Sequence, residues 1–189
     1  MNEAKTQSRP QIRVKELAMI ALLTAVTCIL APLSIPIGEV PISLTNLVIY
    51  FSLYILGMKK GVLSYIVSLL IGFVGVPVFS GYTSGPQKLL GPTGGYLIGF
   101  LPMAVIAGLV IGRCYRKTVL CFLAMIAGTA VCYAFGTAWL AHVGGYSLKA
   151  ALFAGVVPFI PGDLIKMGLA AILGPQIRKQ LVRAHLLED

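Results

Sequence analysis

A carboxylate and an ammonium group lie three residues apart in a strongly apolar stretch near the C-terminus. The stretch reads PFIPGDLIKMGLAAILGPQIRK. Its Asp163 is the only carboxylate within the apolar segments of the chain, and Lys166 is the ammonium group beside it. Placing either charge at the centre of a membrane helix costs about 2.5–3.5 kcal/mol. A spacing of three puts both side chains on one helix face. We therefore expect them to line a polar cavity that binds a ligand.

The residues before this pair indicate a broken helix. Pro158, Pro161 and Gly162 favour an extended segment that ends where a helix begins, leaving free N–H groups and a positive dipole end beside Asp163. Broken helices of this kind often form binding sites inside membranes. Two other interpretations stay open: a structural ion pair that locks the helix to itself, and a proton-carrying Asp163.

A second unusual segment runs from Gly75 to Phe100. Its glycines flank Pro92 and predict a turn whose backbone N–H groups open a helix and hold an anion or polar group; tight helix packing is the alternative. Aromatic walls with a few polar groups suit a small, partly apolar ligand. The candidate ligand-binding residues of this segment are Phe79, Tyr82, Gln87, Lys88, Gly91, Thr93 and Tyr96.

The elements that position these residues must be membrane helices. Of the 189 residues, 58% are hydrophobic and 11% are charged, whereas soluble domains average about 25% charged residues. Apolar segments fall at about 17–35, 43–57, 61–80, 93–112, 118–141 and 148–177. Each is about long enough to cross a hydrocarbon core of ~30 Å, the second only just. The fold class is thus an all-α integral membrane protein with six transmembrane helices.

The distribution of Lys and Arg predicts the orientation. With both termini cytoplasmic, twelve of the 15 basic residues lie inside, and only Lys88, Lys149 and Lys166 lie elsewhere. Such a bias in short loops determines topology. We expect a cytoplasmic N-terminal segment at 1–16, a six-helix domain at 17–177 and a cytoplasmic tail at 178–189.

The sequence lacks the motifs of metal, nucleotide-binding and catalytic sites. The four cysteines form no C-x-x-C pair and are expected to be buried free thiols, and no metal site is expected. No phosphate-binding G-x-x-x-x-G-K-[ST] loop and no H-E-x-x-H motif occurs. His142 is placed in an outer loop and His185 in the tail, both as surface residues. We expect no enzyme, no cofactor and no nucleic-acid partner.

Small residues form a smooth stripe on the first predicted helix. Ala18, Ala21 and Ala25 share a face, and small residues let helices approach closely in lipid. The stripe either packs within the protein or docks another membrane protein, and the residues alone favour neither.

Three motifs resemble one known family. GVPVF at 75–79, GPTGGYLIGF at 91–100 and PFIPGDLIK at 158–166 are similar to the BioY proteins, the biotin-specific substrate-binding membrane subunits of energy-coupling factor transporters. The resemblance covers essentially the whole chain. It implies high-affinity capture of biotin from outside and uptake driven by a transmembrane coupling protein with two ATP-binding subunits. It also implies that Asp163 and Lys166 contact biotin and that the alanine stripe docks the partner, in the plasma membrane of a prokaryote.

Atomic roles follow from the chemistry of biotin. A carboxylate suits the ureido N–H groups and Lys166 suits the ureido carbonyl, while Gln87, Lys88 or the backbone at 91–93 receives the acidic tail. The reverse assignment, with Lys166 on the tail, is nearly as good. We expect the rings to pack against Phe79, Tyr82 and Tyr96, and the outer loops, including 34–41, to close as a lid. The alternatives are a solitary ion-coupled transporter and an assembly subunit without a ligand.

Overall fold

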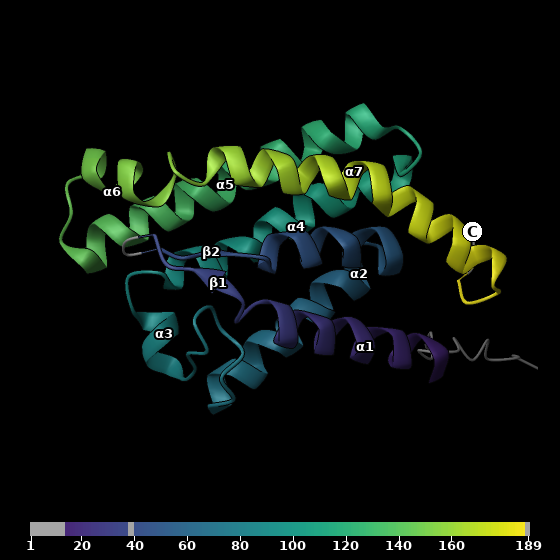
Figure 1. Cartoon of the computed structure of the whole chain (residues 1–189), viewed down its shortest axis with the longest axis horizontal. Coiled ribbons are helices and arrows are strands. Elements are labelled where there is room, and N and C mark those ends of the chain that lie inside the picture. Colours follow the sequence, from purple (N-terminus) through teal and green to yellow (C-terminus); the bar gives the residue numbers. More distant parts are fainter. Residues whose placement is uncertain (1–13, 38–39, 188–189) are drawn as a thin grey trace, which may run out of the picture.

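The computed structural model describes residues 14–37 and 40–187, and it forms a helical bundle with one small hairpin (Figure 1). The helices are α1 (Val14–Leu30), α2 (Thr45–Val74), α3 (Pro86–Leu90), α4 (Gly94–Cys114), α5 (Thr118–Gly144), α6 (Leu148–Gly155) and α7 (Ile160–Arg183). The strands are β1 (Ser34–Ile35) and β2 (Ile42–Ser43), which pair antiparallel. The expected all-helical membrane architecture is confirmed, apart from the hairpin.

Helix α2 contains a sharp reversal at Gly57, which adopts a left-handed φ of 75°. A Cβ atom on Gly61 would lie 3.1 Å from the Leu53 side chain and 3.3 Å from the Ser52 carbonyl. In a straight helix, residues eight or nine apart are about 12–13 Å apart, so the second arm folds back on the first. The two arms correspond to the segments predicted at 43–57 and 61–80.

The last apolar segment is broken as predicted. Helices α6 and α7 meet at an angle of 48° across residues 156–159. The connection is a turn rather than the extended segment we expected, because Phe159 already has helical backbone angles and the Asp163 N–H bonds to its carbonyl. Pro161 lies in the first turn of α7, where its missing N–H costs nothing.

Several predicted boundaries change. Helix α5 continues to Gly144 and therefore contains His142, which we expected in a loop. Helix α7 continues to Arg183, beyond the predicted end at 177. The short helix α3 was not anticipated within the glycine-rich loop, where Pro86 starts it.

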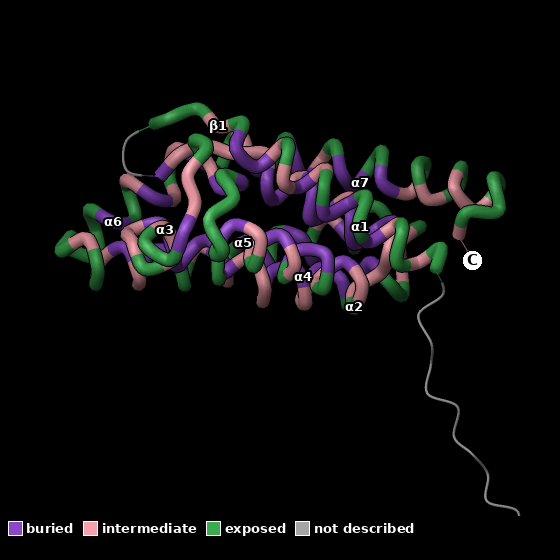
Figure 2. Tube along the Cα trace, turned by 90° about the horizontal axis from the view of Figure 1, so that it is seen from below, coloured by how far each residue is buried: buried purple, intermediate pink, exposed green. Residues whose placement is uncertain are grey.

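Among the described residues, α4 and α5 are each long and apolar enough to cross a membrane. Helix α2 is so only if its two arms are counted as one helix, and the bent pair α6–α7 makes a further candidate. Helix α1 has 17 described residues and is apolar as well. Large apolar side chains point outward along these helices, among them Leu22, Phe73, Phe135 and Ile172. Figure 2 shows buried positions concentrated where helices face one another and exposed positions on the outer faces. An apolar exterior of this extent indicates contact with lipid.

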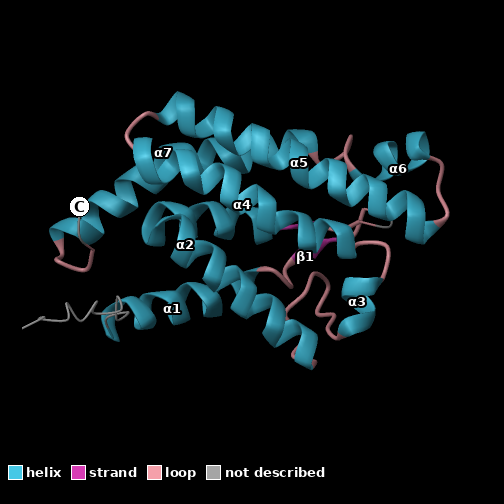
Figure 3. Cartoon of the chain, turned by 180° about the vertical axis from the view of Figure 1, so that it is seen from behind, coloured by secondary structure: helices cyan, strands magenta, loops and turns pink. Residues whose placement is uncertain are grey.

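The bundle has two ends that carry different elements (Figure 3). One end carries the start of α1, the Gly57 reversal, the turn between α4 and α5, and the end of α7. The other end carries the hairpin, α3 and the connection from α5 to α6. The start of α7, with Asp163 in its first turn, faces this second end.

Candidate functional site

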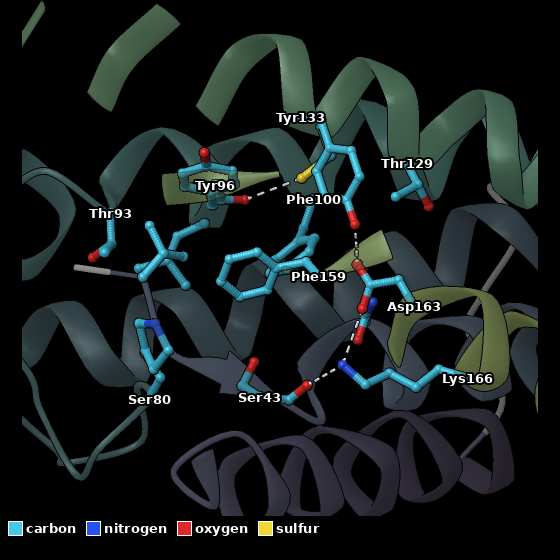
Figure 4. Close-up of a pocket in the computed structure, with 16 residues that line it drawn as sticks. Ser43, Ser80, Thr93, Tyr96, Phe100, Thr129, Tyr133, Phe159, Asp163 and Lys166 are labelled. Carbon is cyan, nitrogen blue, oxygen red and sulfur yellow. Dashed lines mark hydrogen bonds and ion pairs between the residues drawn. The ribbon is translucent and has the colours of Figure 1, made fainter. Parts of the chain in front are cut away.

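A pocket lies between the starts of α4 and α7, the middle of α5 and the hairpin (Figure 4). Its cavity volume is about 60 Å³, and the pocket is open to solvent. Its lining residues come from five separate parts of the chain. They are Val40, Pro41, Ser43, Asn46, Ser80, Thr93, Tyr96, Leu97, Phe100, Thr129, Cys132, Tyr133, Gly155, Phe159, Asp163 and Lys166.

Asp163 and Lys166 form a buried ion pair on the pocket wall. Their exposed fractions are 7% and 8%, and Lys166 Nζ lies 3.0 Å from Asp163 Oδ1. The other carboxylate oxygen accepts a hydrogen bond of 2.7 Å from the Tyr133 hydroxyl on α5. Asp163 thus accepts hydrogen bonds from two donors, one of them charged.

Lys166 also joins α7 to the hairpin. Its ammonium group donates a hydrogen bond of 2.6 Å to the main-chain carbonyl of Ser43 on β2. Ser43 in turn anchors the start of α2 through a 2.9 Å contact between its hydroxyl and that of Thr45. The position of the hairpin over the pocket is therefore coupled to the charged pair.

The pair retains hydrogen-bonding capacity for a ligand. An ammonium group has three donors, and Lys166 uses two of them on Asp163 and Ser43. A carboxylate has about four lone-pair positions, and Asp163 uses two of them. A polar group entering the pocket can therefore bind both residues without breaking their existing contacts.

The remaining walls are mostly apolar and aromatic. Tyr96, Phe100 and Phe159 line one side, and Phe100 is held edge-on by Tyr65 at 6.0 Å between ring centroids. Thr129 is fixed by a 2.6 Å hydrogen bond with the fully buried Tyr50 hydroxyl. Rigid aromatic walls beside a few convergent polar groups are typical of sites for small, partly apolar molecules.

The structure places four of the nine predicted ligand-binding residues on this pocket: Asp163, Lys166, Tyr96 and Thr93. The pocket wall excludes Phe79, whose ring packs on Gly72, and Tyr82, which is 64% exposed. Phe79 belongs to a separate small apolar cluster with Val78 and Leu97.

The other three predicted residues also lie outside the pocket wall. Gln87 is exposed and folds over Gly85, and Lys88 is half-buried in α3. Burial lowers the pKa of the Lys88 ammonium group below its usual value. The Gly91 carbonyl accepts a hydrogen bond of 2.9 Å from the Trp139 indole.

The glycine-rich turn opens α4 as predicted, and two of its glycines are required by close packing. A Cβ atom on Gly94 would collide with the Leu89 carbonyl, and one on Gly95 would collide with Trp139. The Gly94 N–H bonds to the Gly91 carbonyl at 3.0 Å, so it is not available to an anion. These contacts fit the packing interpretation of the turn.

Sequence reasoning missed Tyr133, which contacts Asp163, and two other polar residues of the pocket wall. Tyr133 and Thr129 lie four residues apart in the fifth apolar segment and share a helix face. Asn46, 4% exposed, is the one amide in the second segment. The available signal was a polar residue inside an apolar segment. Uncharged polar residues in such segments are candidates for the site in the same way as Asp163 and Lys166.

The alanine stripe of α1 lies on the outside. Ala18, Ala21 and Ala25 are exposed, while Leu23 and Thr24 on the opposite face are buried. The Thr24 hydroxyl contacts that of Ser64 on the second arm of α2 at 3.0 Å. The stripe is therefore not used for packing within the described part of the chain.

Comparison with known proteins decides the family. The profile of the BioY family matches residues 3–183. The chain belongs to the BioY family. A probable biotin transporter BioY of Pyrococcus horikoshii is 35% identical over 167 residues, which is 88% of this chain and 98% of that protein. The biotin transporter BioY of Thermotoga maritima is also 35% identical, over 88% of this chain and 97% of its own length.

A solved structure shares the fold. The crystal structure of the S-component for biotin from an ECF-type ABC transporter superposes with a TM-score of 0.82 at 30% identity, covering 91% of this chain and 95% of that one. The resemblance of the motifs to the BioY family is thereby confirmed. These BioY-family relatives are named as transporters, in agreement with the expectation that the chain is not an enzyme.

Proposed function

We propose that this chain is the biotin-binding membrane subunit of an energy-coupling factor transporter. One observation carries the proposal: a buried Asp163–Lys166 pair with hydrogen-bonding capacity to spare faces an aromatic-walled pocket. The names of its relatives, which are transporters of biotin or the S-component for biotin, support the ligand.

The chemistry of biotin suits this pocket. Its ureido group presents two N–H donors and one carbonyl acceptor within a plane. The free lone pairs of Asp163 accept the N–H groups, and the free donor of Lys166 binds the carbonyl. The fused rings pack against Tyr96, Phe100 and Phe159, which line the same pocket.

The acidic tail of biotin then extends toward the connection between α3 and α4. Thr93 lines the pocket there, and Gln87, Lys88 and Gly91 lie beyond its wall. The half-buried Lys88 of α3 is the cation near this end of the pocket, where it can attract the tail carboxylate. The reverse assignment places the tail carboxylate on Lys166 and leaves the ureido group near Thr93.

We infer six membrane crossings, and the helices in the described residues support this number. The six segments are helix α1, the two arms of α2, helices α4 and α5, and the broken pair α6–α7. The basic end of the bundle is cytoplasmic, because Lys59, Arg113 and Lys179 lie in its connections and helix ends. The pocket then opens toward the outside of the plasma membrane of a prokaryotic cell.

In this proposal the energy for uptake comes from other subunits, and this chain has no phosphate-binding loop of its own. We infer a transmembrane coupling protein and two ATP-binding subunits as partners. The exposed stripe of Ala18, Ala21 and Ala25 provides a smooth surface on which a partner helix can approach closely.

Biotin titration of the purified protein tests the proposal. Trp139 is the single tryptophan and bonds to Gly91, two residues from Thr93 on the pocket wall, so its fluorescence reports binding. We expect one site with a dissociation constant below about 1 μM, and binding weakened about tenfold or more in Asp163→Asn. Absence of binding by both fluorescence and calorimetry would contradict the proposal.

The solitary ion-coupled transporter remains the second candidate, because Asp163 is a buried carboxylate in the membrane. It predicts proton-driven uptake into vesicles that contain this chain alone. An assembly subunit without a ligand predicts association with ATP-binding partners but no biotin binding. Biotin titration separates the biotin-binding subunit from the assembly subunit, and vesicle uptake separates it from the ion-coupled transporter.

A further inference from the structure

A second open groove lies at the opposite end of the bundle from the biotin pocket. It runs between the turn that joins α4 to α5 and the last turns of α7. One wall carries Tyr115 and Arg116. The other wall is one face of α7, formed by Pro175, Gln176, Lys179, Val182 and Arg183.

Two exposed cations on α7 face this groove without an acidic partner among the described residues. Lys179 and Arg183 are four residues apart, a spacing at which like charges on a helix repel each other. The two acidic residues that the structure describes are engaged elsewhere, Glu16 with Lys60 at 2.6 Å and Asp163 with Lys166. An anion between Lys179 and Arg183 would remove the repulsion.

The groove is held in shape by Tyr115. The guanidinium carbon of Arg178 lies 4.6 Å from the centre of the Tyr115 ring, and that of Arg116 lies 5.5 Å from it. Arg178 also donates a hydrogen bond of 3.0 Å to the Tyr54 carbonyl. These contacts fix the end of α7 against the turn between α4 and α5, so the groove exists before any ligand enters.

The groove joins cations to an apolar surface at a helix end. Pro175, Val182 and the Tyr115 ring lie beside Lys179 and Arg183 in the lining of the groove, near the end of α7. A free phosphate ion would use only the cationic part. In the proposed topology this end of the bundle lies at the membrane surface, so a lipid can place its phosphate on the cations and its chains on the apolar part. Basic head-group pockets between membrane helices have this arrangement.

We propose that this groove binds the phosphate head group of an anionic phospholipid such as phosphatidylglycerol. The phosphate lies on Lys179 and Arg183, and the glycerol backbone and upper chains lie along Pro175 and Val182. The bound lipid joins α7, which carries Asp163 at its other end, to the turn between α4 and α5. This site does not depend on the identity of the transported ligand.

Native mass spectrometry tests the proposal. The full chain is reconstituted with equal amounts of phosphatidylglycerol and phosphatidylcholine, extracted in mild detergent, and its retained lipids are counted. We expect phosphatidylglycerol to be retained about tenfold over phosphatidylcholine, and Lys179→Gln/Arg183→Gln to abolish the preference. The matched control is Lys59→Gln/Lys117→Gln, which removes the same charge from exposed residues of the same end outside the groove.

Each outcome is decisive once thermal unfolding shows that both double variants are folded. Loss of the preference in the groove variant alone supports the lipid site. An equal loss in the control would mean general surface charge and would overturn the proposal. Retention of inorganic phosphate in place of lipid, tested by adding millimolar phosphate, would also overturn it, as would a preference unchanged in the groove variant.

Discussion

The Tyr133 hydroxyl on α5 donates a hydrogen bond of 2.7 Å to the Asp163 carboxylate on α7, opposite the side that Lys166 occupies. Asp163 is thereby held from two directions, by a neutral donor across the helix interface and by a cation on its own helix (Figure 4). The uncharged Tyr133 therefore helps to orient the Asp163 carboxylate toward the pocket.

We expect Tyr133→Phe to weaken biotin binding without unfolding the protein. A hydrogen bond to a charged group is worth about 1.5–3 kcal/mol, or roughly 10- to 150-fold in affinity. Tyr54→Phe is the matched control, because the buried Tyr54 hydroxyl has no hydrogen-bond partner among the described residues. Calorimetric titration of both variants with biotin measures the difference; equal affinities would show that Tyr133 does not orient Asp163.

The charged pair predicts an asymmetry between single and double substitutions. Lys166→Met leaves the buried Asp163 carboxylate without its counter-ion, which costs about 3–5 kcal/mol of stability. Asp163→Asn/Lys166→Met removes both charges, so most of the lost stability returns. Thermal unfolding in detergent without ligand measures both variants. A double variant less stable than the single variant would refute this view of the pair.

Helix packing predicts that a glycine-to-alanine substitution destabilises the protein at the start of α4 but not near its end. Gly95→Ala places a methyl group against Trp139 and forces α4 away from α5, which lowers the unfolding temperature by several degrees. Gly112→Ala in the same helix is the control, since no atom outside the helix's own neighbourhood lies within 4 Å of its Cβ position. Similar unfolding temperatures for the two variants would contradict the packing described here.

The alanine stripe predicts a loss of partner binding alone. Ala21→Leu/Ala25→Leu roughens the exposed face of α1, so co-purification with the coupling protein and ATP-binding subunits falls about tenfold or more while biotin affinity stays unchanged. The control is Ala127→Leu/Ala130→Leu, which makes the same change on the exposed face of α5. A stripe in contact with lipid only would leave both double variants fully associated.

Much of this fold could be read from local patterns in the sequence. Hydropathy located the helices, Gly57 lies where the connection between the second and third segments was expected, and the prolines before Asp163 indicated the break between α6 and α7. These features depend on neighbouring residues, which the sequence shows directly.

The site could be predicted only in part. Asp163 and Lys166 were identified by the cost of their charges, but Tyr133 and Ser43 lie 30 and 123 residues from their partners in the chain. Nothing local marks such contacts. Phe79 was assigned to the site by its aromatic type, yet the fold places its ring over Gly72, where a small residue leaves space.

Comparing biotin with its methyl ester tests the central claim most directly, because the ester lacks the charged tail and keeps the ureido group. If Asp163 and Lys166 bind the ureido group, Lys166→Met and Asp163→Asn weaken both ligands by the same factor, about tenfold or more. The affinities come from calorimetric titration of the unmodified chain and the two variants. If Lys166→Met weakens biotin but leaves the ester unaffected, Lys166 binds the tail carboxylate and the assignment is wrong. If neither substitution affects either ligand, the pair is structural and the biotin site lies elsewhere.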